Sequence, residues 1–156
     1  MKWEEFVTPG PAHKALEPLV GEWNVEAPWT GVSKATTRRQ WILGGRYLQE
    51  EFTGEINQKP YQGLGIMGYD NFRKKYFSTW IHTVATSFAI SEGTMDADGK
   101  VLTLLGKADD PMTGQKDKPT KCIIHILGPD KHTVEFYDPT RGENSKIGES
   151  VYTRKR

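Results

Sequence analysis

Only one of the 156 residues is a cysteine, Cys122. A single cysteine excludes an intramolecular disulfide and any metal site built on several thiolates, and it is typical of proteins from a reducing compartment. The chain also lacks an apolar run of the ~18 residues that a membrane-spanning helix needs. Residues 1–6 include acidic side chains where a secretory signal would be apolar. We therefore expect a cytoplasmic protein without a membrane span.

An excess of charge of either sign is missing as well. The sequence has 21 Lys and Arg residues against 20 Asp and Glu residues, a net charge of +1. Proteins bind nucleic acids through clustered positive charge, so we expect no nucleic-acid partner. Hydrophobic residues make up 36% and aromatic residues 11% of the chain, which indicates a packed globular domain.

Motifs for metal binding and hydrolysis are absent. No G-x-S-x-G nucleophile motif, no H-E-x-x-H motif and no short histidine pair occurs, and the single cysteine completes no zinc-binding pattern. The four histidines are His13, His82, His125 and His132. We therefore expect no metal and no cofactor, and the sequence favours a protein that is not an enzyme.

Residues 63–68 match the dinucleotide-binding pattern G-x-G-x-x-G. That fingerprint requires a helix after its third glycine, whereas residues 69–71 here form a turn that leads to another strand. Glycine within a strand more often allows a bend or the close approach of a neighbour. We interpret the pattern in that way.

Turn-forming residues are abundant. Nine turns are expected at fairly even spacing, eight of them at clusters with Gly, Pro, Asp or Asn, and the segments between them are rich in β-branched and aromatic residues. Several segments alternate between apolar and polar residues, as half-buried strands do. Ten strands in a meander lose their exposed edges by closing. We predict an all-β fold, a closed antiparallel up-and-down barrel of about ten strands over residues 21–155, in a single domain of residues 1–156.

The segment before the predicted barrel has a different pattern. Residues 9–20 combine a proline suited to a first helical turn with good helix formers and with apolar residues that include Leu16 and Leu19. Pro18 limits this helix to one or two turns. We predict an N-terminal arm, residues 1–20, whose short helix plugs one end of the barrel.

One predicted strand, residues 76–82, places aromatic and polar side chains on the same face. Ligand cavities combine apolar walls with a few polar groups in this way, although ordinary core packing gives the same pattern. Neighbouring strands are expected to add residues of the same kind. The candidate ligand-binding residues are Glu50, Phe52, Tyr69, Trp80, His82 and Tyr137.

Glu50 and Glu51 are adjacent and therefore point to opposite faces of their strand. Glu50 shares its face with Phe52, and its carboxyl is desolvated if that face is interior. Two interpretations stay open. Glu50 contacts a ligand or acts as a general acid or base, or it is a buried carboxylate paired with an arginine such as Arg39 or Arg46.

The first and last strands of the predicted barrel carry a recognisable pair of residues. Trp23 follows the plug helix in the order Gly-Glu-Trp, and Arg154 lies on the last strand. This resembles the G-x-W motif and terminal arginine of lipocalin-like barrels. The resemblance implies that Trp23 closes the barrel and that Arg154 packs across its ring, a structural cation–π contact of roughly 0.5–2 kcal/mol.

A longer set of motifs covers nearly the whole chain. These motifs lie at residues 11–13, 19–23, 39–52, 63–65, 68–71, 78–80, 91–94, 110–114 and 152–155. Together they resemble an uncharacterised, mostly bacterial family, the domain-of-unknown-function family 1579. The resemblance implies a lipocalin-like or calycin-like barrel, and it carries no activity or catalytic residue.

The leading interpretation is a lipocalin-like protein that binds a small, largely apolar or amphipathic molecule in the barrel lumen. Related fatty-acid carriers hold a carboxylate with Arg-x-Tyr on the last strand, whereas Tyr152 here precedes Arg154, which favours the cap role for Arg154. One alternative is a small-molecule enzyme that transfers protons through Glu50 or His82. Another is a haem-binding barrel with His82 or His125 as axial ligand. A third is a structural or interaction module, as a monomer or homodimer.

Overall fold

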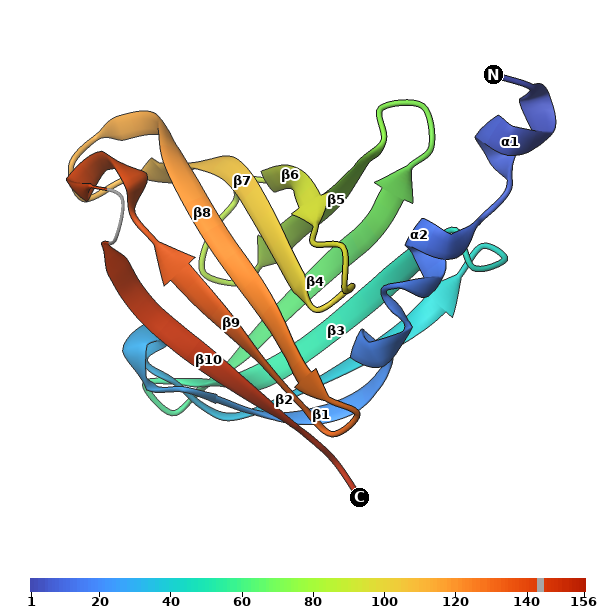
Figure 1. Ribbon diagram of the computed structural model, residues 1–156. Coiled ribbons are helices and arrows are strands. Elements are labelled where there is room, and N and C mark those ends of the chain that lie inside the picture. The colour runs from blue at the N-terminus through green and yellow to red at the C-terminus, as the bar shows by residue number, and fades with distance from the viewer. Residues whose placement is uncertain (143–144) are drawn as a thin grey trace.

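The computed structural model describes residues 1–142 and 145–156. Its ten strands form one closed antiparallel barrel in which each strand pairs with its neighbours in sequence and β1 pairs with β10 (Figure 1). The strands are β1 (Gly21–Ala27), β2 (Val32–Ile42), β3 (Tyr47–Ile56), β4 (Lys59–Asp70), β5 (Lys75–His82), β6 (Ala89–Met95), β7 (Val101–Asp110), β8 (Gln115–Gly128), β9 (Lys131–Tyr137) and β10 (Lys146–Arg154). The predicted all-β up-and-down barrel is confirmed.

The ladder between β1 and β10 closes the barrel. Trp23 lies opposite Arg154, and Val25 lies opposite Tyr152. Because each strand then has a partner on both sides, the backbone groups that an open sheet would expose at its edges are paired. Closure also brings residues from the two ends of the chain onto the same side of the lumen.

The glycines of β4 let a large side chain lie against the strand. Gly65 is opposite Trp80 of β5, and the Trp80 ring packs against both Gly63 and Gly65. A methyl group at Gly63 would overlap this ring. The glycine-rich segment is thus a strand that accommodates Trp80, as its sequence context predicts.

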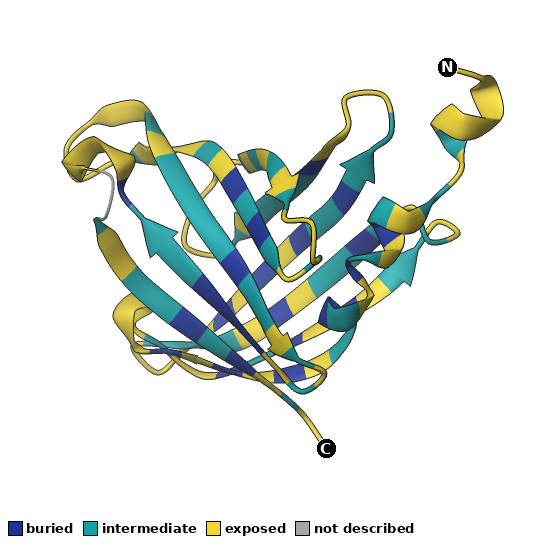
Figure 2. Ribbon diagram, viewed as in Figure 1, coloured by how far each residue is buried: buried dark blue, intermediate teal, exposed yellow. Residues whose placement is uncertain are grey.

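The N-terminal arm contains α1 (Trp3–Val7), α2 (Pro11–Lys14) and a single 3-10 turn, η1 (Glu17–Leu19). In the plug, Leu16 and Leu19 are 0% and 1% exposed, because they cover one end of the barrel. The short helix and its apolar side match the prediction. Helix α1 was not predicted, and it contains no buried residue (Figure 2). None of the described helices is long and apolar enough to cross a membrane.

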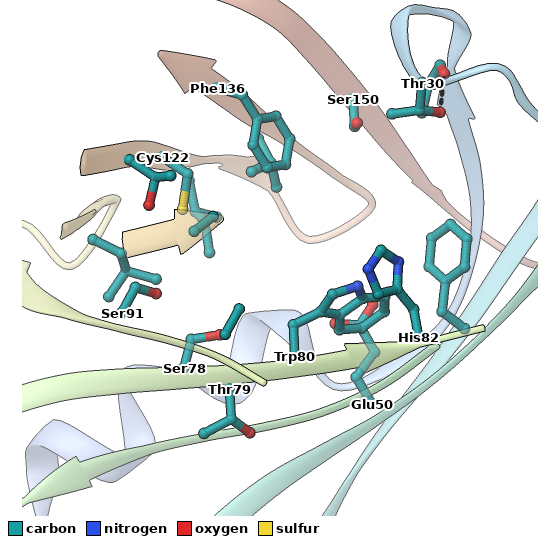
Figure 3. Close-up of a pocket in the computed structure, with 18 of the residues that line it drawn as sticks. Thr30, Glu50, Ser78, Thr79, Trp80, His82, Ser91, Cys122, Phe136 and Ser150 are labelled. Atoms are coloured by element: carbon teal, nitrogen blue, oxygen red, sulfur yellow. Dashed lines mark hydrogen bonds between the residues drawn. The ribbon is translucent and has the colours of Figure 1, made fainter. Parts of the chain in front are cut away.

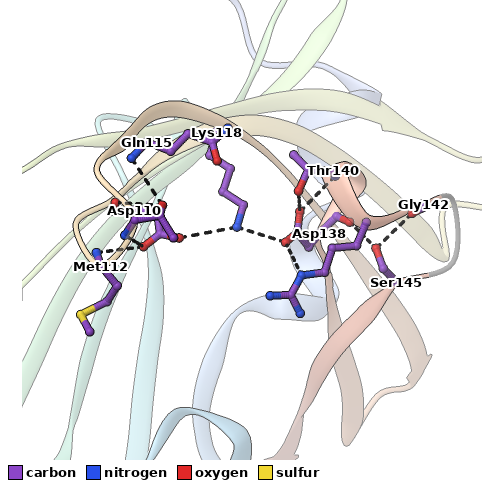
Figure 4. Close-up of polar contacts among 10 residues, drawn as sticks. Asp110, Met112, Gln115, Lys118, Asp138, Thr140, Gly142 and Ser145 are labelled. Carbon is purple, nitrogen blue, oxygen red and sulfur yellow. Dashed lines mark hydrogen bonds and ion pairs between the residues drawn. The ribbon is translucent and has the colours of Figure 1, made fainter.

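Ion pairs join two connections at the end of the barrel opposite the plug. Lys118 of β8 lies 3.7 Å from the carboxylate of Asp110 and 3.1 Å from that of Asp138 (Figure 4). Asp138 precedes a 3-10 turn, η3 (Pro139–Arg141), and accepts a hydrogen bond from the backbone N–H of Thr140. These contacts hold together the rim of the open end between β7 and β10.

Candidate functional site

A cavity of about 690 Å³ occupies the half of the barrel away from the plug. Its depth is visible on four strands, where one residue lines the cavity and the residue two positions nearer the plug is buried beneath it. These pairs are Val25 and Trp23, Glu50 and Leu48, Leu104 and Leu102, and Val134 and His132. The cavity therefore has a floor at about the middle of the barrel, and its volume is within the range of roughly 300–1,000 Å³ that is typical of small-molecule sites.

The cavity opens to solvent at the end opposite the plug. Val84 and Ile147 line it and are also 58% and 47% exposed. A residue can meet both conditions only where the cavity reaches the surface. The opening is consequently bordered by apolar side chains, an arrangement suited to the entry of an apolar molecule.

Aromatic side chains from β3, β4 and β5 form one wall of the cavity. The aromatic wall consists of Phe52, Tyr61, Trp80 and His82, whose neighbouring rings lie 5.7 to 6.3 Å apart between centroids. The Tyr61 hydroxyl lies 2.8 Å from Nδ1 of His82. Burial lowers the pKa of His82, so its ring is neutral at pH 7. The aromatic wall faces Cys122, Phe136 and Ser150 across the lumen (Figure 3).

The floor of the cavity carries an ion pair between adjacent strands. Arg39 of β2 lies opposite Glu50 of β3, and its Nε is 3.4 Å from a carboxylate oxygen of Glu50. The other oxygen of Glu50 accepts a hydrogen bond of 2.7 Å from the hydroxyl of Thr37. The Arg39 side chain is only 4% exposed and the Glu50 side chain 16%. Of the two open interpretations of Glu50, the structure shows the pair with Arg39, and it also places Glu50 on the cavity surface.

Below this pair, a buried histidine accepts a hydrogen bond from Arg39. Nη1 of Arg39 lies 3.0 Å from Nε2 of His132, and because a guanidinium only donates, Nε2 is the acceptor and the proton resides on Nδ1. Burial, together with the charges of Arg39 and Arg154, lowers the pKa of His132 to about 2. His132 is therefore an uncharged support for Arg39. Within the described residues, Nδ1 of His132 and Nε of Arg39 are buried without a hydrogen-bond partner.

A column of rings connects the cavity floor to the closed end. The Arg39 guanidinium lies 4.9 Å from the centroid of the Tyr152 ring, which stacks on His132 at 4.5 Å. His132 meets Trp23 edge to face at 4.4 Å, and the Arg154 guanidinium lies 4.2 Å from the Trp23 ring. The contact expected between Trp23 and Arg154 is thus present. The indole N–H of Trp23 also donates to the carbonyl oxygen of Leu19 at 3.0 Å and ties the column to the plug.

Five of the six candidate ligand-binding residues line the cavity: Glu50, Phe52, Trp80, His82 and Tyr137. Tyr69 is on the inward face but at the depth of the plug, where its ring contacts His13 and Tyr76. Tyr137 lies at the rim, and its hydroxyl donates to Glu135 at 3.0 Å. Tyr69 therefore does not line the cavity, and Tyr137 reaches only its rim, because its side chain shares the outer face with Glu135.

The direction of His125 bears on the haem alternative. Its neighbours Cys122 and Ile124 line the cavity, and Ile124 is the next residue along the strand, so His125 points to the outer face. There it contacts Glu135. His125 is thus outside the lumen, and His82 is the histidine on the cavity surface. In residues 1–142 and 145–156, no group of three or more His, Cys, Asp or Glu side chains is placed to hold a metal ion.

Several residues of the site have no local signal in the sequence. Arg39 was named only as a partner for Glu50, and Thr37, His132 and Tyr152 were not expected in the floor. His132 and Arg39 are 93 positions apart. Only the pairing of β1 with β10 places them together, so the hydrogen bond could be found from closure of the barrel and not from any motif.

No curated protein matches the sequence. A family model described as a protein of unknown function (DUF1579) matches residues 8–154. This span includes all ten strands, the plug and every residue of the cavity. The chain therefore belongs to the DUF1579 family, the family that its motifs resemble.

Proposed function

We propose that this protein is a binding protein that holds a small, largely apolar molecule in the barrel lumen. The observation that carries the proposal is the cavity of about 690 Å³, with largely apolar and aromatic walls, an opening to solvent and a pair of charged groups at its floor. Apolar walls supply affinity in proportion to the area they bury, and a few polar groups fix the orientation of the ligand. The same arrangement supports the lipocalin-like interpretation.

The residues proposed to contact the ligand fall into two groups. Phe52, Trp80 and His82 of the aromatic wall would pack against its apolar body, and Glu50 with Arg39 would meet its polar group. Cys122 lies on the opposite wall, where burial raises the pKa of its thiol to about 11. Cys122 is therefore a protonated, unreactive part of the wall at neutral pH.

Native mass spectrometry of the protein purified from its expression host tests the proposal first. We expect a mass increment that disappears under denaturing conditions, and extraction into organic solvent should recover an apolar molecule. Binding of N-phenyl-1-naphthylamine, an uncharged apolar dye, tests the lumen directly because its fluorescence rises in an apolar site.

Filling the lumen provides the matched comparison. Cys122→Phe adds a ring to the cavity, whereas Ile123→Phe adds the same ring to the outer face of the same strand. We expect Cys122→Phe to weaken dye binding by about tenfold or more, since the ring occupies the space of the ligand, and Ile123→Phe to leave it unchanged. Equal binding by both variants and the original protein, with all three folded, would contradict the proposal.

A further inference from the structure

The polar floor of the lumen is electrically balanced, and this restricts the ligand. Arg39 and Glu50 are the charged side chains on the floor, and they pair with each other at 3.4 Å. His132 adds no charge, because it is the neutral acceptor of the hydrogen bond from Arg39. The remaining charged residues around the cavity are Lys107 and Lys121, and both share the outer face of the barrel with the exposed Leu105, away from the floor.

From this balance we propose that the lumen selects ligands whose polar group is uncharged and both donates and accepts hydrogen bonds, such as an alcohol or a primary amide, over carboxylates with the same chain. This inference rests on the proposed function and specifies the ligand class of the same site.

A carboxylate at the floor would place two negative charges against one guanidinium. Like charges in a site with little water repel each other strongly, and a buried charge without its own partner is unfavourable. A protonated amine would create the converse imbalance next to Arg39. An uncharged group avoids both costs.

The hydrogen-bonding groups of the floor also match such a ligand. A guanidinium only donates and a carboxylate only accepts, so the pair presents both functions side by side. Nε of Arg39 is itself buried and lies 3.4 Å from Glu50, so a ligand would meet the Glu50 carboxylate and the other N–H groups of the guanidinium. The hydroxyl or amide group of a ligand at the cavity floor would accept a hydrogen bond from Arg39 and donate one to Glu50.

Lys107 and Lys121 offer the main rival arrangement, in which a carboxylate sits at the opening. Lys107 is solvent-exposed, and Nζ of Lys121 lies 5.5 Å from the centroid of the Tyr137 ring. Ion pairs in water contribute little to affinity, so these lysines hold an anion weakly in comparison with a buried floor.

Three compounds with the same ten-carbon chain test the proposal by calorimetric titration at pH 7.5: decan-1-ol, decanamide and decanoate. The acid is ionised at this pH, since a carboxyl group has an ordinary pKa of about 4.3. We expect the alcohol and the amide to bind about tenfold or more tightly than decanoate, because only decanoate adds a charge to the floor. Equal or tighter binding of decanoate would overturn the proposal.

Glu50→Gln removes the negative charge of the floor while keeping the shape of the side chain. In this variant Arg39 has no anionic partner, so affinity for decanoate should rise by about tenfold, whereas the affinity for decan-1-ol should change by less than about threefold. Glu51→Gln is the matched control, because Glu51 lies next in sequence on the outer face and pairs with Arg38 at 3.1 Å. It should bind all three compounds as the original protein does.

The outcomes separate the two proposals. If none of the three compounds binds the original protein and its purified form carries no apolar molecule, both the proposed function and this inference fail. If the compounds bind but decanoate is preferred, or Glu50→Gln leaves decanoate affinity unchanged, only the charge-balance inference fails. The ranking in the original protein decides the question by itself should Glu50→Gln not fold.

Discussion

At the scale of single residues, the contact between Trp80 and the glycines of β4 shapes the aromatic wall. The Trp80 ring lies against Gly63 and Gly65, so it packs on β4 and leaves the lumen open. Any side chain at these positions would push the indole into the cavity. Small residues on one strand therefore create space for a large residue on the next.

Gly63→Ala tests this arrangement. The added methyl overlaps the Trp80 ring, and such overpacking should lower the free energy of unfolding by about 1–3 kcal/mol. Gly128→Ala serves as the control, because nothing lies within 4 Å of a methyl group at Gly128. Urea unfolding curves measure both, and equal stability of the two variants would show that Trp80 does not need the glycine.

His132 makes stability depend on pH in a defined direction. Its pKa in the folded protein is about 2, whereas an unfolded chain takes up a proton on this ring below its ordinary value of 6.5. The unfolded state thus binds more protons between pH 6.5 and 2, and stability falls as the pH falls through this window. At pH 5 the loss from this residue should be about 2 kcal/mol, from 1.36 kcal/mol per pH unit.

Comparing His132→Phe with the original protein isolates this effect. Phenylalanine keeps a ring against Trp23 and Tyr152 but does not titrate, so the loss of stability between pH 7.5 and pH 5 should be about 2 kcal/mol smaller. His125→Phe, on the outer face, should retain the loss that His132 causes. Chemical unfolding at the two pH values measures each loss, and an identical loss in His132→Phe would refute the assignment.

At the scale of elements, the two helical parts of the arm have different roles. The plug buries Leu16 and Leu19 completely, whereas α1 contains no buried residue. Helix α1 is held at the surface, where the side-chain amide of Asn71 donates to the carbonyl oxygens of Glu5, Phe6 and Thr8 and the Phe6 ring meets Phe72 edge to face at 6.4 Å. The plug therefore supports the barrel, and α1 is an addition to it.

Two truncations in the arm measure this difference. Leu19→Ala should destabilise the protein by about 2–5 kcal/mol, because it leaves a void between the plug and the barrel end. Phe6→Ala removes a side chain that is 47% exposed and should cost less than about 1 kcal/mol. Thermal and urea unfolding compare the two, and a similar cost for both would mean that α1 stabilises the barrel as much as the plug does.

The elements that the sequence predicted are those with a strong local signal. Alternation and turn residues identified the strands, and Pro18 with the apolar spacing identified the plug. Helix α1 escaped prediction because a five-residue helix without a buried face has no periodicity to detect. The direction of His125 was also unpredictable, since both faces of residues 122–127 are apolar and either parity is compatible with a strand.

At the scale of the whole molecule, closure of the barrel assembles the site. The floor combines Arg39 and Glu50 from the N-terminal strands with His132 and Tyr152 from the C-terminal strands. Alternation predicted that Glu50, Phe52, Trp80 and His82 share the lumen, but the depth of each residue follows from the barrel register. For this reason Tyr69 was correctly predicted to face the barrel interior, but it lies at the depth of the plug and not at that of the cavity.

Depth also explains why one half of the lumen is packed and the other is open. The plug, the capping Trp23 and the buried leucines fill the closed end, whereas the half nearer the mouth encloses the cavity. The protein is thus divided into a stabilising half and a half available for binding.

The tryptophan indole N–H signals in a two-dimensional NMR spectrum provide the most direct test of binding in this open half. Trp80 lines the cavity and Trp29 borders its mouth, whereas Trp3, Trp23 and Trp41 do not contact it. On titration with decan-1-ol, we predict that the Trp80 signal shifts most, that Trp29 follows and that the other three stay in place. Shifts confined to Trp3, or no shift at any tryptophan, would contradict the proposal that the barrel binds a ligand in its lumen.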